Sequence, residues 1–407
     1  YIPIIWKAAV AAATGRDDAS MKIKGYARKN GTYGVRNHLV ILPTSVCASE
    51  TASRIAHLVP GAVALPHQNG CCQVGEDYEQ TVRTLVGFGK NPNVGAVLVI
   101  GLGCEGIQAG AVADQIRVTG KPVETIIIQE NNGTTGAIRE GVRIASALSA
   151  ELSQQDKVEF DISRITLGLE CGGSDPTSGI ASNPVQGVCS DLLIKAGGSS
   201  ILSETTEMIG AEFLLAARAI NKEVGDRFLA MVKRTEQRAI DMGQDLRGSQ
   251  PTPGNIEGGL STIEEKSLGC IYKAGKAALT GTLEYGENIP DQPRGLYFMD
   301  TPGQDIDSIT GMVAGGAQIV LFTTGRGTPT GCPIAPVIKI TGNDETYRKM
   351  IENIDINAGR VIVDGASVDE LGQELFDEMI RVANGKLTKA EALGHNEFGI
   401  FRIGYTF

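Results

Sequence analysis

The chain has 407 residues, of which 42% are hydrophobic and 21% are charged, and its formal net charge is -10. This near-average composition, with no apolar stretch long enough to cross a bilayer, argues against a disordered chain and against a membrane protein. The negative charge and the lack of a long basic run argue against nucleic-acid binding and favour a small metabolite as the partner.

Eight cysteines occur in the chain without a recognisable secretory signal. Such cysteines are typically metal-binding, catalytic or buried, so we expect no disulfide framework and a cytoplasmic protein. Residues 1–20 are rich in alanine, contain the only tryptophan and precede Met21. We interpret them as a tag or foreign segment and leave them out of the fold.

From Met21 onward, short apolar runs alternate with longer helical patterns. The runs are nearly continuous in apolar character, which is typical of strands buried on both faces of a parallel sheet. Strands are predicted at 38–43, 62–66, 95–100, 123–129 and 165–170, with helices at 77–89 and 133–152.

A second series of the same kind follows. It predicts strands at 199–203, 295–299, 318–323 and 335–341, and helices at 207–219 and 222–243. The Pro/Gly-rich stretch 248–261 has the length and composition of a functional loop. The sequence therefore predicts an α/β fold of two Rossmann-like parallel-sheet domains with helices on both faces, spanning residues 21–160 and 161–407.

The turn GLGCEG at 101–106 has the spacing of a dinucleotide-binding fingerprint through Gly101, Gly103 and Gly106. It lies between a predicted strand and a predicted helix, as that fingerprint requires. An NAD-dependent oxidoreductase, with Glu124 or Glu130 on the ribose, is therefore an alternative function. The fingerprint does not explain the cysteine within the turn.

Cysteines follow three of the predicted strands, at Cys71, Cys104 and Cys171. The carboxyl ends of parallel strands form the ligand-binding edge of a sheet, and three thiolates there suit iron. We expect the cysteines to hold either a single Fe2+, with His67 as a further ligand, or a [4Fe-4S] cluster with one iron left open. The alternative is that these are ordinary buried cysteines, as we expect for Cys47, Cys189 and Cys270, while Cys332 is a reserve ligand.

Seven ordered blocks resemble the large catalytic region of the altronate and galactarate dehydratases. They are GYARKNGTYGVRN, HQNGC, GLGCE, CGGSDPTSGIASNP, SETTEMIGAE, TPGNIEGGLSTIEEKSLG and FTTGRGTPTG. The resemblance implies an iron-dependent lyase that eliminates water from a hydroxy (sugar) acid, or sulfite from sulfolactate as in the family's sulfo-lyases. It also places Cys71, Cys104 and Cys171 at the family's shared cysteine positions.

The small N-terminal domain typical of this family is not recognisable in the chain. The resemblance therefore implies a split enzyme with a separate small subunit, and assembly into a homo-oligomer.

Such an elimination requires a base and cationic groups that grip a carboxylate. Glu204, Glu207 or Lys266 is the expected base, and His67 is a second acid–base candidate. Under the alternative interpretation, Glu204 and Glu207 cap the start of a helix and Lys266 is a surface lysine. The substrate-binding candidates are Arg36, Asn37, Asn255, Arg326 and Lys339. The two arginines could instead form ordinary structural salt bridges. Asp175 is expected to hold a backbone turn.

Overall fold

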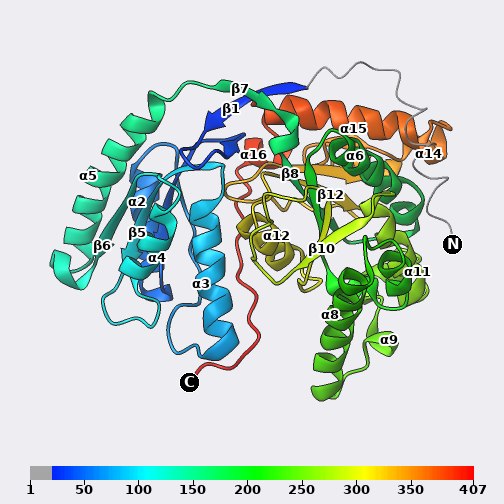
Figure 1. Ribbon diagram of the computed structural model, residues 1–407, viewed down its shortest axis with the longest axis horizontal. Helices are drawn as coiled ribbons and strands as arrows, with labels where there is room; N and C mark the ends of the chain where they lie inside the picture. Colours follow the sequence, from blue (N-terminus) through cyan, green and yellow to red (C-terminus); the bar gives the residue numbers. More distant parts are fainter. Residues whose placement is uncertain (1–20) are drawn as a thin grey trace.

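The computed structural model describes residues 21–407, so the interpretation of residues 1–20 lies outside the described residues. Two parallel sheets lie side by side in two lobes, each with helices packed against it (Figure 1). The predicted α/β class is confirmed. The domain boundary at residue 160 stays a prediction.

The first sheet has the strand order β4-β3-β5-β6, and all its strands are parallel. Alternate residues of each strand face opposite sides, so Leu39 packs with α2 and α5 while Val40 packs with α3 and α4. The elements are β3 (His38–Pro43), α2 (Val46–Leu58), β4 (Ala62–Ala64), α3 (Gly75–Lys90), β5 (Val94–Gly101), α4 (Ala109–Arg117), β6 (Val123–Ile127), η1 (Gln129–Asn131) and α5 (Thr134–Ser153).

The second sheet has the order β10-β11-β9-β8-β12-β13-β14, again parallel throughout. Its strands are β8 (Thr166–Gly172), β9 (Ser199–Leu202), β10 (Leu279–Leu283), β11 (Leu296–Met299), β12 (Ile319–Thr324), β13 (Val337–Thr341) and β14 (Ile356–Asn357). Residues of α6 (Asn183–Lys195), α8 (Lys222–Asp241) and α15 (Val368–Ala383) pack on one face, and α12 (Asp305–Ala314) packs on the other.

Shorter helices fill the connections of this second half. They are η2 (Ile162–Arg164), η3 (Ser178–Ser182), η4 (Thr205–Met208), α7 (Glu212–Ala216), α9 (Leu246–Ser249), α10 (Pro253–Glu257), α11 (Ile263–Ile271), η5 (Tyr272–Ala274), α13 (Asp344–Lys349), α14 (Arg360–Val363) and α16 (Lys389–Leu393).

One apolar core joins the two sheets. It contains Leu85 and Phe88 of α3, Met312 of α12, and strand residues from both sheets. A small antiparallel sheet of β1 (Lys22–Ala27), β2 (Tyr33–Gly34) and β7 (Val158–Asp161) lies beside them. The C-terminal segment then runs back between the lobes next to α3 (Figure 1).

The predicted strands agree with the structure to within a few residues. The predicted helix 207–219 is wrong, because Gly210 adopts a φ of +90° and ends the helical path between η4 and α7. The predicted loop 248–261 includes the end of α9 and all of α10.

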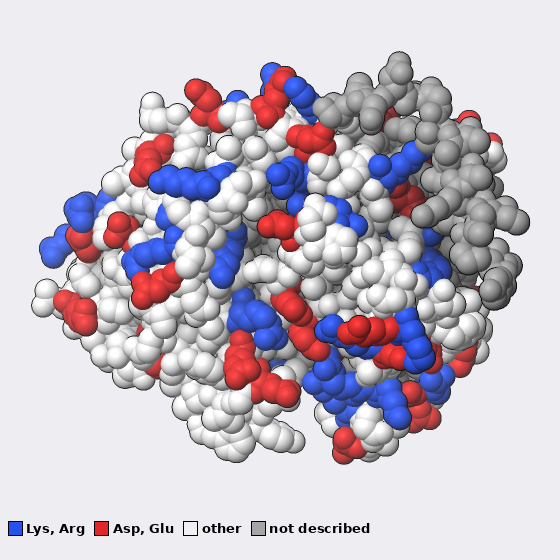
Figure 2. Space-filling view, in the orientation of Figure 1, with Lys and Arg blue, Asp and Glu red and all other residues white. Residues whose placement is uncertain are grey.

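Basic and acidic side chains are interspersed on the face shown in Figure 2. No helix among residues 21–407 combines the length and apolar character needed to cross a membrane.

Candidate active site

A group of ionisable side chains gathers where the neighbouring strands β8 and β9 end. Glu170 and Cys171 are the fifth and sixth residues of β8, and Glu204 follows β9 by two residues. Glu204 has a φ of +68°, a backbone conformation that residues other than glycine seldom adopt. Its backbone N–H donates to Thr301 Oγ1 at 2.7 Å, which ties this turn to the end of β11. Unusual backbone geometry of this kind is common at functional sites.

The ammonium of Lys273, on η5, lies at the centre of this group and is fully buried. Its Nζ lies 3.0 Å from Cys171 Sγ and 3.0 Å from Glu207 Oε2, and it also donates to Glu204 Oε2. A second cation, Lys266 of α11, lies 3.2 Å from Glu207 Oε1. Two carboxylates are thus held by two ammonium groups inside the protein.

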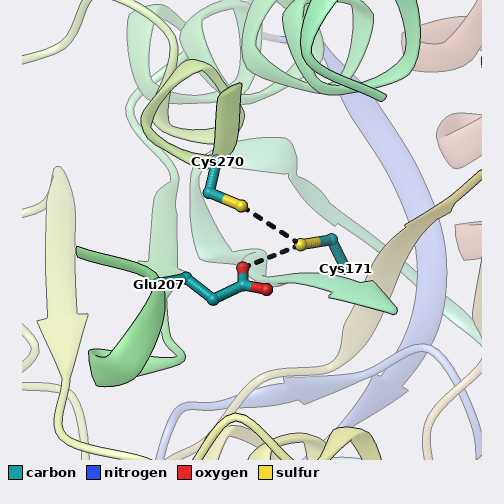
Figure 3. Close-up of side chains that lie close together, drawn as sticks. All are labelled: Cys171, Glu207 and Cys270. Atoms are coloured by element: carbon teal, nitrogen blue, oxygen red, sulfur yellow. Dashed lines mark hydrogen bonds between the residues drawn. The ribbon is translucent and has the colours of Figure 1, made fainter. Parts of the chain in front are cut away.

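Cys171 and Cys270 lie next to the same carboxylate (Figure 3). The Cys171 thiol donates to Glu207 Oε2 at 2.8 Å, and the two sulfurs are 3.7 Å apart. Cys270 packs in the apolar core as predicted, and its sulfur also reaches this polar group. The Cys171 sulfur, the Cys270 sulfur and a Glu207 oxygen form a group with the spacing of metal ligands.

The environment separates the acidities of the two glutamates. Burial, together with the neighbouring Glu207 charge, raises the pKa of Glu204 to about 7. Burial acts in the same direction on Glu207, but Lys273 and Lys266 outweigh it and hold its pKa below the ordinary value. Burial acts to lower the pKa of Lys266, but Glu207, Cys270, Cys171 and Glu204 together outweigh it, so the pKa is raised. This raised pKa favours Lys266 as a cation over Lys266 as a base, and its role in the reaction stays a prediction.

A second group of side chains also has the spacing of metal ligands. It consists of three carboxylates, those of Glu170, Glu204 and Asp305. Glu170 Oε2 accepts hydrogen bonds from Ser308 at 2.7 Å and Ser203 at 3.2 Å. The other oxygens, Glu170 Oε1 and Glu204 Oε1, are buried without a hydrogen-bond partner. Such orphaned oxygens are costly and point to a missing cation or proton.

A cavity of about 210 Å³ leads to this region from the surface. Lys266, Cys270, Ser174, Asp175 and Asn183 are among its lining residues. The side chain of Lys266 remains 14% exposed, so it connects the buried cluster with the cavity. A small acid in this cavity would meet an ammonium group first.

Cys71 and Cys104 lie in exposed turns beyond the first sheet. Their turns touch, since the Ile107 N–H donates to the Gly70 carbonyl at 3.2 Å. Among residues 21–407, neither cysteine belongs to a group with metal-ligand spacing. The site formed by Cys71, Cys104 and Cys171 stays a prediction.

The glycine turn after β5 holds a carboxylate of its own chain. Glu105 accepts hydrogen bonds from the backbone N–H groups of Leu102 at 3.1 Å and Gly103 at 2.6 Å. A Cβ on Gly101 would lie 2.4 Å from a Glu105 oxygen, so that glycine makes room for the glutamate. Two of the amides that a pyrophosphate would need are therefore already used, which weighs against the NAD alternative.

Two substrate-binding candidates are engaged in structural contacts. All five N–H donors of Arg36 are used, by Glu391 and by the carbonyls of Val35, Val382 and Lys386. Asn37 bridges Arg28, Leu152 and Gln155. Neither residue has a free group to offer a substrate in this arrangement.

His67 is buried with both ring nitrogens engaged. Nε2 donates to the Pro43 carbonyl at 2.9 Å, and Nδ1 accepts from the Asn69 N–H at 3.1 Å. Lys339 donates to the carbonyls of Pro329 and Thr330, and is equally buried. Both contacts are structural.

The remaining candidates lie nearer the cavity. Asn255 caps α10 and donates to the Ser174 carbonyl at 2.9 Å. Asp175 accepts from the Ser178 N–H at 3.1 Å and so holds a turn. Arg326 is partly exposed and pairs with Glu257 at 3.0 Å. Cys332, the reserve ligand, is buried in the core shared by the two sheets.

The sequence interpretation identified Cys171, Glu204, Glu207 and Lys266, which the structure brings together. It missed Lys273, Glu170 and Asp305. Glu170 carried a signal, because it is a carboxylate inside an apolar strand, where charge is costly unless it is used. Lys273 gave no comparable signal in its surroundings.

Comparisons with known proteins cover nearly the whole described chain. Residues 25–153 match the family model for the second domain of D-galactarate dehydratase/altronate hydrolase, and residues 162–406 match the model for the C-terminal domain of D-galactarate/altronate dehydratase. The (2R)-sulfolactate sulfo-lyase subunit beta of Chromohalobacter salexigens is 42% identical, over 93% of this chain and 97% of that protein.

Two dehydratases are also similar. The altronate dehydratase of Bacillus subtilis is 37% identical, over 94% of this chain and 78% of its own length. The galactarate dehydratase (L-threo-forming) of Escherichia coli is 36% identical, over 79% of this chain and 62% of its own length. With both family models matched in order, the chain belongs to the D-galactarate/altronate dehydratase family.

Proposed function

We propose that this chain is the large subunit of a lyase that removes water from a hydroxy acid, or sulfite from sulfolactate. Family membership supports the reaction class, and the similarity to a sulfo-lyase subunit beta supports a separate small subunit. The observation that carries the proposal is the buried cluster of Glu204, Glu207 and Lys273, with Lys266 reaching the cavity. Paired carboxylates with separated pKa values are typical of acid–base catalysis.

The chain supplies the groups that such an elimination needs. Lys266, at the wall of the cavity, binds the substrate carboxylate. Glu204, with a pKa of about 7, takes the proton next to that carboxylate and returns it to the leaving group or to solvent. Glu207, held as a carboxylate by both lysines, fixes their positions.

A divalent metal fits the carboxylate group. Glu170 and Asp305 offer oxygen ligands, and Glu170 Oε1 is buried without a hydrogen-bond partner, while Glu204 beside them stays available as the base. When bound, the metal would act as a Lewis acid on the hydroxyl and carboxylate oxygens of the substrate. We propose iron as the metal. The cysteine trio is the rival ligand set, because thiolates suit iron as well.

Metal content and activity of ligand variants distinguish the two sets. The protein is purified without oxygen, loaded with Fe2+, and analysed for iron and acid-labile sulfide. If the carboxylates hold the metal, Glu170→Gln and Asp305→Asn lose iron, whereas the double variant Cys71→Ser/Cys104→Ser keeps it. Loss of iron and sulfide in the cysteine variant, with full retention in the carboxylate variants, would contradict the carboxylate site.

Substrate assays decide the leaving group. Sulfolactate, altronate and galactarate are each tested with the chain alone and with a candidate small subunit. Lys266→Met should raise KM for the active acid strongly, since it removes the ammonium at the cavity. Absence of turnover of every hydroxy acid by the iron-loaded complex would contradict the proposed function.

A further inference from the structure

A second cavity, of about 460 Å³, lies at the opposite edge of the sheets from the candidate active site. Its lining residues come just before the strands: Lys90 before β5, Arg164 before β8, Arg294 before β11 and Gln318 before β12. The candidate active site is built from residues at the carboxyl ends of strands. The two sites therefore share no lining residue.

Three cations and one carboxylate line this second cavity. They are Lys90, Arg164, Arg294 and Asp291. Within the described residues, the three cationic side chains make no hydrogen bond and no ion pair. Burial lowers the pKa of half-buried Arg294, the nearby Asp291 carboxylate opposes this, and the Arg164 guanidinium adds to the lowering. The lining therefore sets three cations against the single carboxylate of Asp291, in a chain whose net charge is -10.

The helix ends beside the cavity do not supply the missing negative charge. The carboxyl end of α3 is already bound by Lys121, whose Nζ donates to the carbonyls of Gly89, Lys90 and Asn91 at 3.0, 2.8 and 2.6 Å. The end of α12 is bound by side-chain amides, since Asn91 donates to Val313 at 2.8 Å and Asn288 donates to Ala314 at 3.0 Å. The partial charges of these carbonyls are thus taken up by other donors.

We propose that this cavity binds a small polyanion, with Arg164, Arg294 and Lys90 as its ligands. Guanidinium groups pair with the oxygens of carboxylates and phosphates through two hydrogen bonds each, and an ammonium group adds a point charge. The walls belong to loops of all three sheets: 30–32 joins β1 to β2, 90–92 leads into β5, and 288–291 lies between β10 and β11. A bound polyanion would link these loops and stabilise the folded chain.

Calorimetric titration with citrate and with pyrophosphate tests the proposal. Both probes are added to the full chain at constant ionic strength, and they distinguish a polycarboxylate ligand from a phosphate ligand. We expect saturable binding of at least one probe, with one site per chain. Arg164→Ala and Arg294→Gln should each weaken it at least about tenfold, because each removes a charge-assisted contact.

Two control variants make the result specific. Arg227→Ala removes an exposed arginine of α8 that makes no hydrogen bond or ion pair within the described part of the chain, and it should bind like the parent protein. Lys266→Met should also retain binding, because Lys266 lines the other cavity. The proposal is overturned if neither probe saturates, if both arginine variants bind like the parent, or if Lys266→Met abolishes binding.

Discussion

Lys273 shows how a single residue can organise a buried site. Its ammonium contacts two carboxylates and a thiol with no exposure to solvent, and these partners come from the turn after β9, from η4 and from the end of β8. Buried ion pairs seldom add much stability, because desolvation offsets their attraction. Stability alone therefore does not explain a cluster of this kind.

His67 is the residue whose surroundings most clearly fix its charge. Its neutral form satisfies both ring nitrogens, whereas protonation of Nδ1 would direct a proton at the Asn69 N–H. Burial lowers the pKa of His67 below its ordinary value of 6.5, and the Pro43 carbonyl only partly opposes this. The unfolded chain therefore binds a proton at this residue at a higher pH than the folded chain does.

The contribution of His67 to stability should consequently fall as the pH drops below 6.5, because the unfolded state there takes up a proton that the folded state excludes. The raised pKa values of Glu204, about 7, and Asp305, about 6, act in the opposite direction, so the effect of His67 is measured as a difference between variant and parent. Between pH 7.5 and 5.5, the thermal unfolding midpoint of His67→Gln should change more favourably than that of the parent. His57→Asn, which changes an exposed histidine of α2, should change like the parent. The same change of midpoint in His67→Gln as in the parent would refute this account.

At the scale of elements, the approach of α3 to α12 sets how the two sheets meet. A Cβ on Gly87 would lie 2.4 Å from the carbonyl oxygen of Ala314, a backbone atom that cannot move aside. Glycine at this position therefore lets the two helices pack in direct contact. The first and second sheets depend on that contact for their shared core.

Gly87→Ala should therefore destabilise the protein by about 1–3 kcal/mol, the usual cost of an overpacked site. Gly110→Ala is the matched control, because Gly110 is exposed in α4 and nothing lies within 4 Å of its added Cβ. The control should be neutral or should gain up to about 1 kcal/mol from better helix propensity. Urea denaturation measures both variants. Equal stability of the two would show that α3 and α12 can separate without cost.

At the scale of the whole molecule, a shared apolar core couples the two sheets. Val97 and Val99 of β5 lie in the same apolar cluster as Val320 and Phe322 of β12. Two further links cross between the lobes, since Arg402 pairs with Asp77 at 2.8 Å and Phe398 packs against Phe88. Neither sheet can open fully without exposing apolar surface of the other.

Native-state hydrogen exchange should therefore report one free energy of opening for the centres of β5 and β12. Ile55→Ala changes the core that the first sheet forms with α2 and α5, and should cost about 2–5 kcal/mol. We expect the protection of β12 to fall as much as that of β5. Ile351→Ala, at a position that is 53% exposed, should change neither. Loss of protection in β5 alone would mean that the sheets unfold separately.

The sequence by itself determined the class of fold and most strand positions. Continuous apolar runs of strand length, such as 38–43, can be read from one chain because burial on both faces constrains every residue of the run. The polar residues just after those runs, including Cys171 and Glu204, were recognisable for the same reason. The path of the chain after residue 207 could not be recognised in this way, because Gly210, at a positive φ, interrupts a segment with a helical pattern.

Only the tertiary structure decided which side chains meet. Cys270 and Lys273 are about a hundred residues from Cys171 along the chain, and their place beside it depends on how α11 and η5 pack over β8 and β9. The same packing gave Arg36 its five structural contacts and gave the glycine turn its own carboxylate. Local pattern constrains burial and backbone, whereas charge pairing between distant segments depends on their relative positions in space.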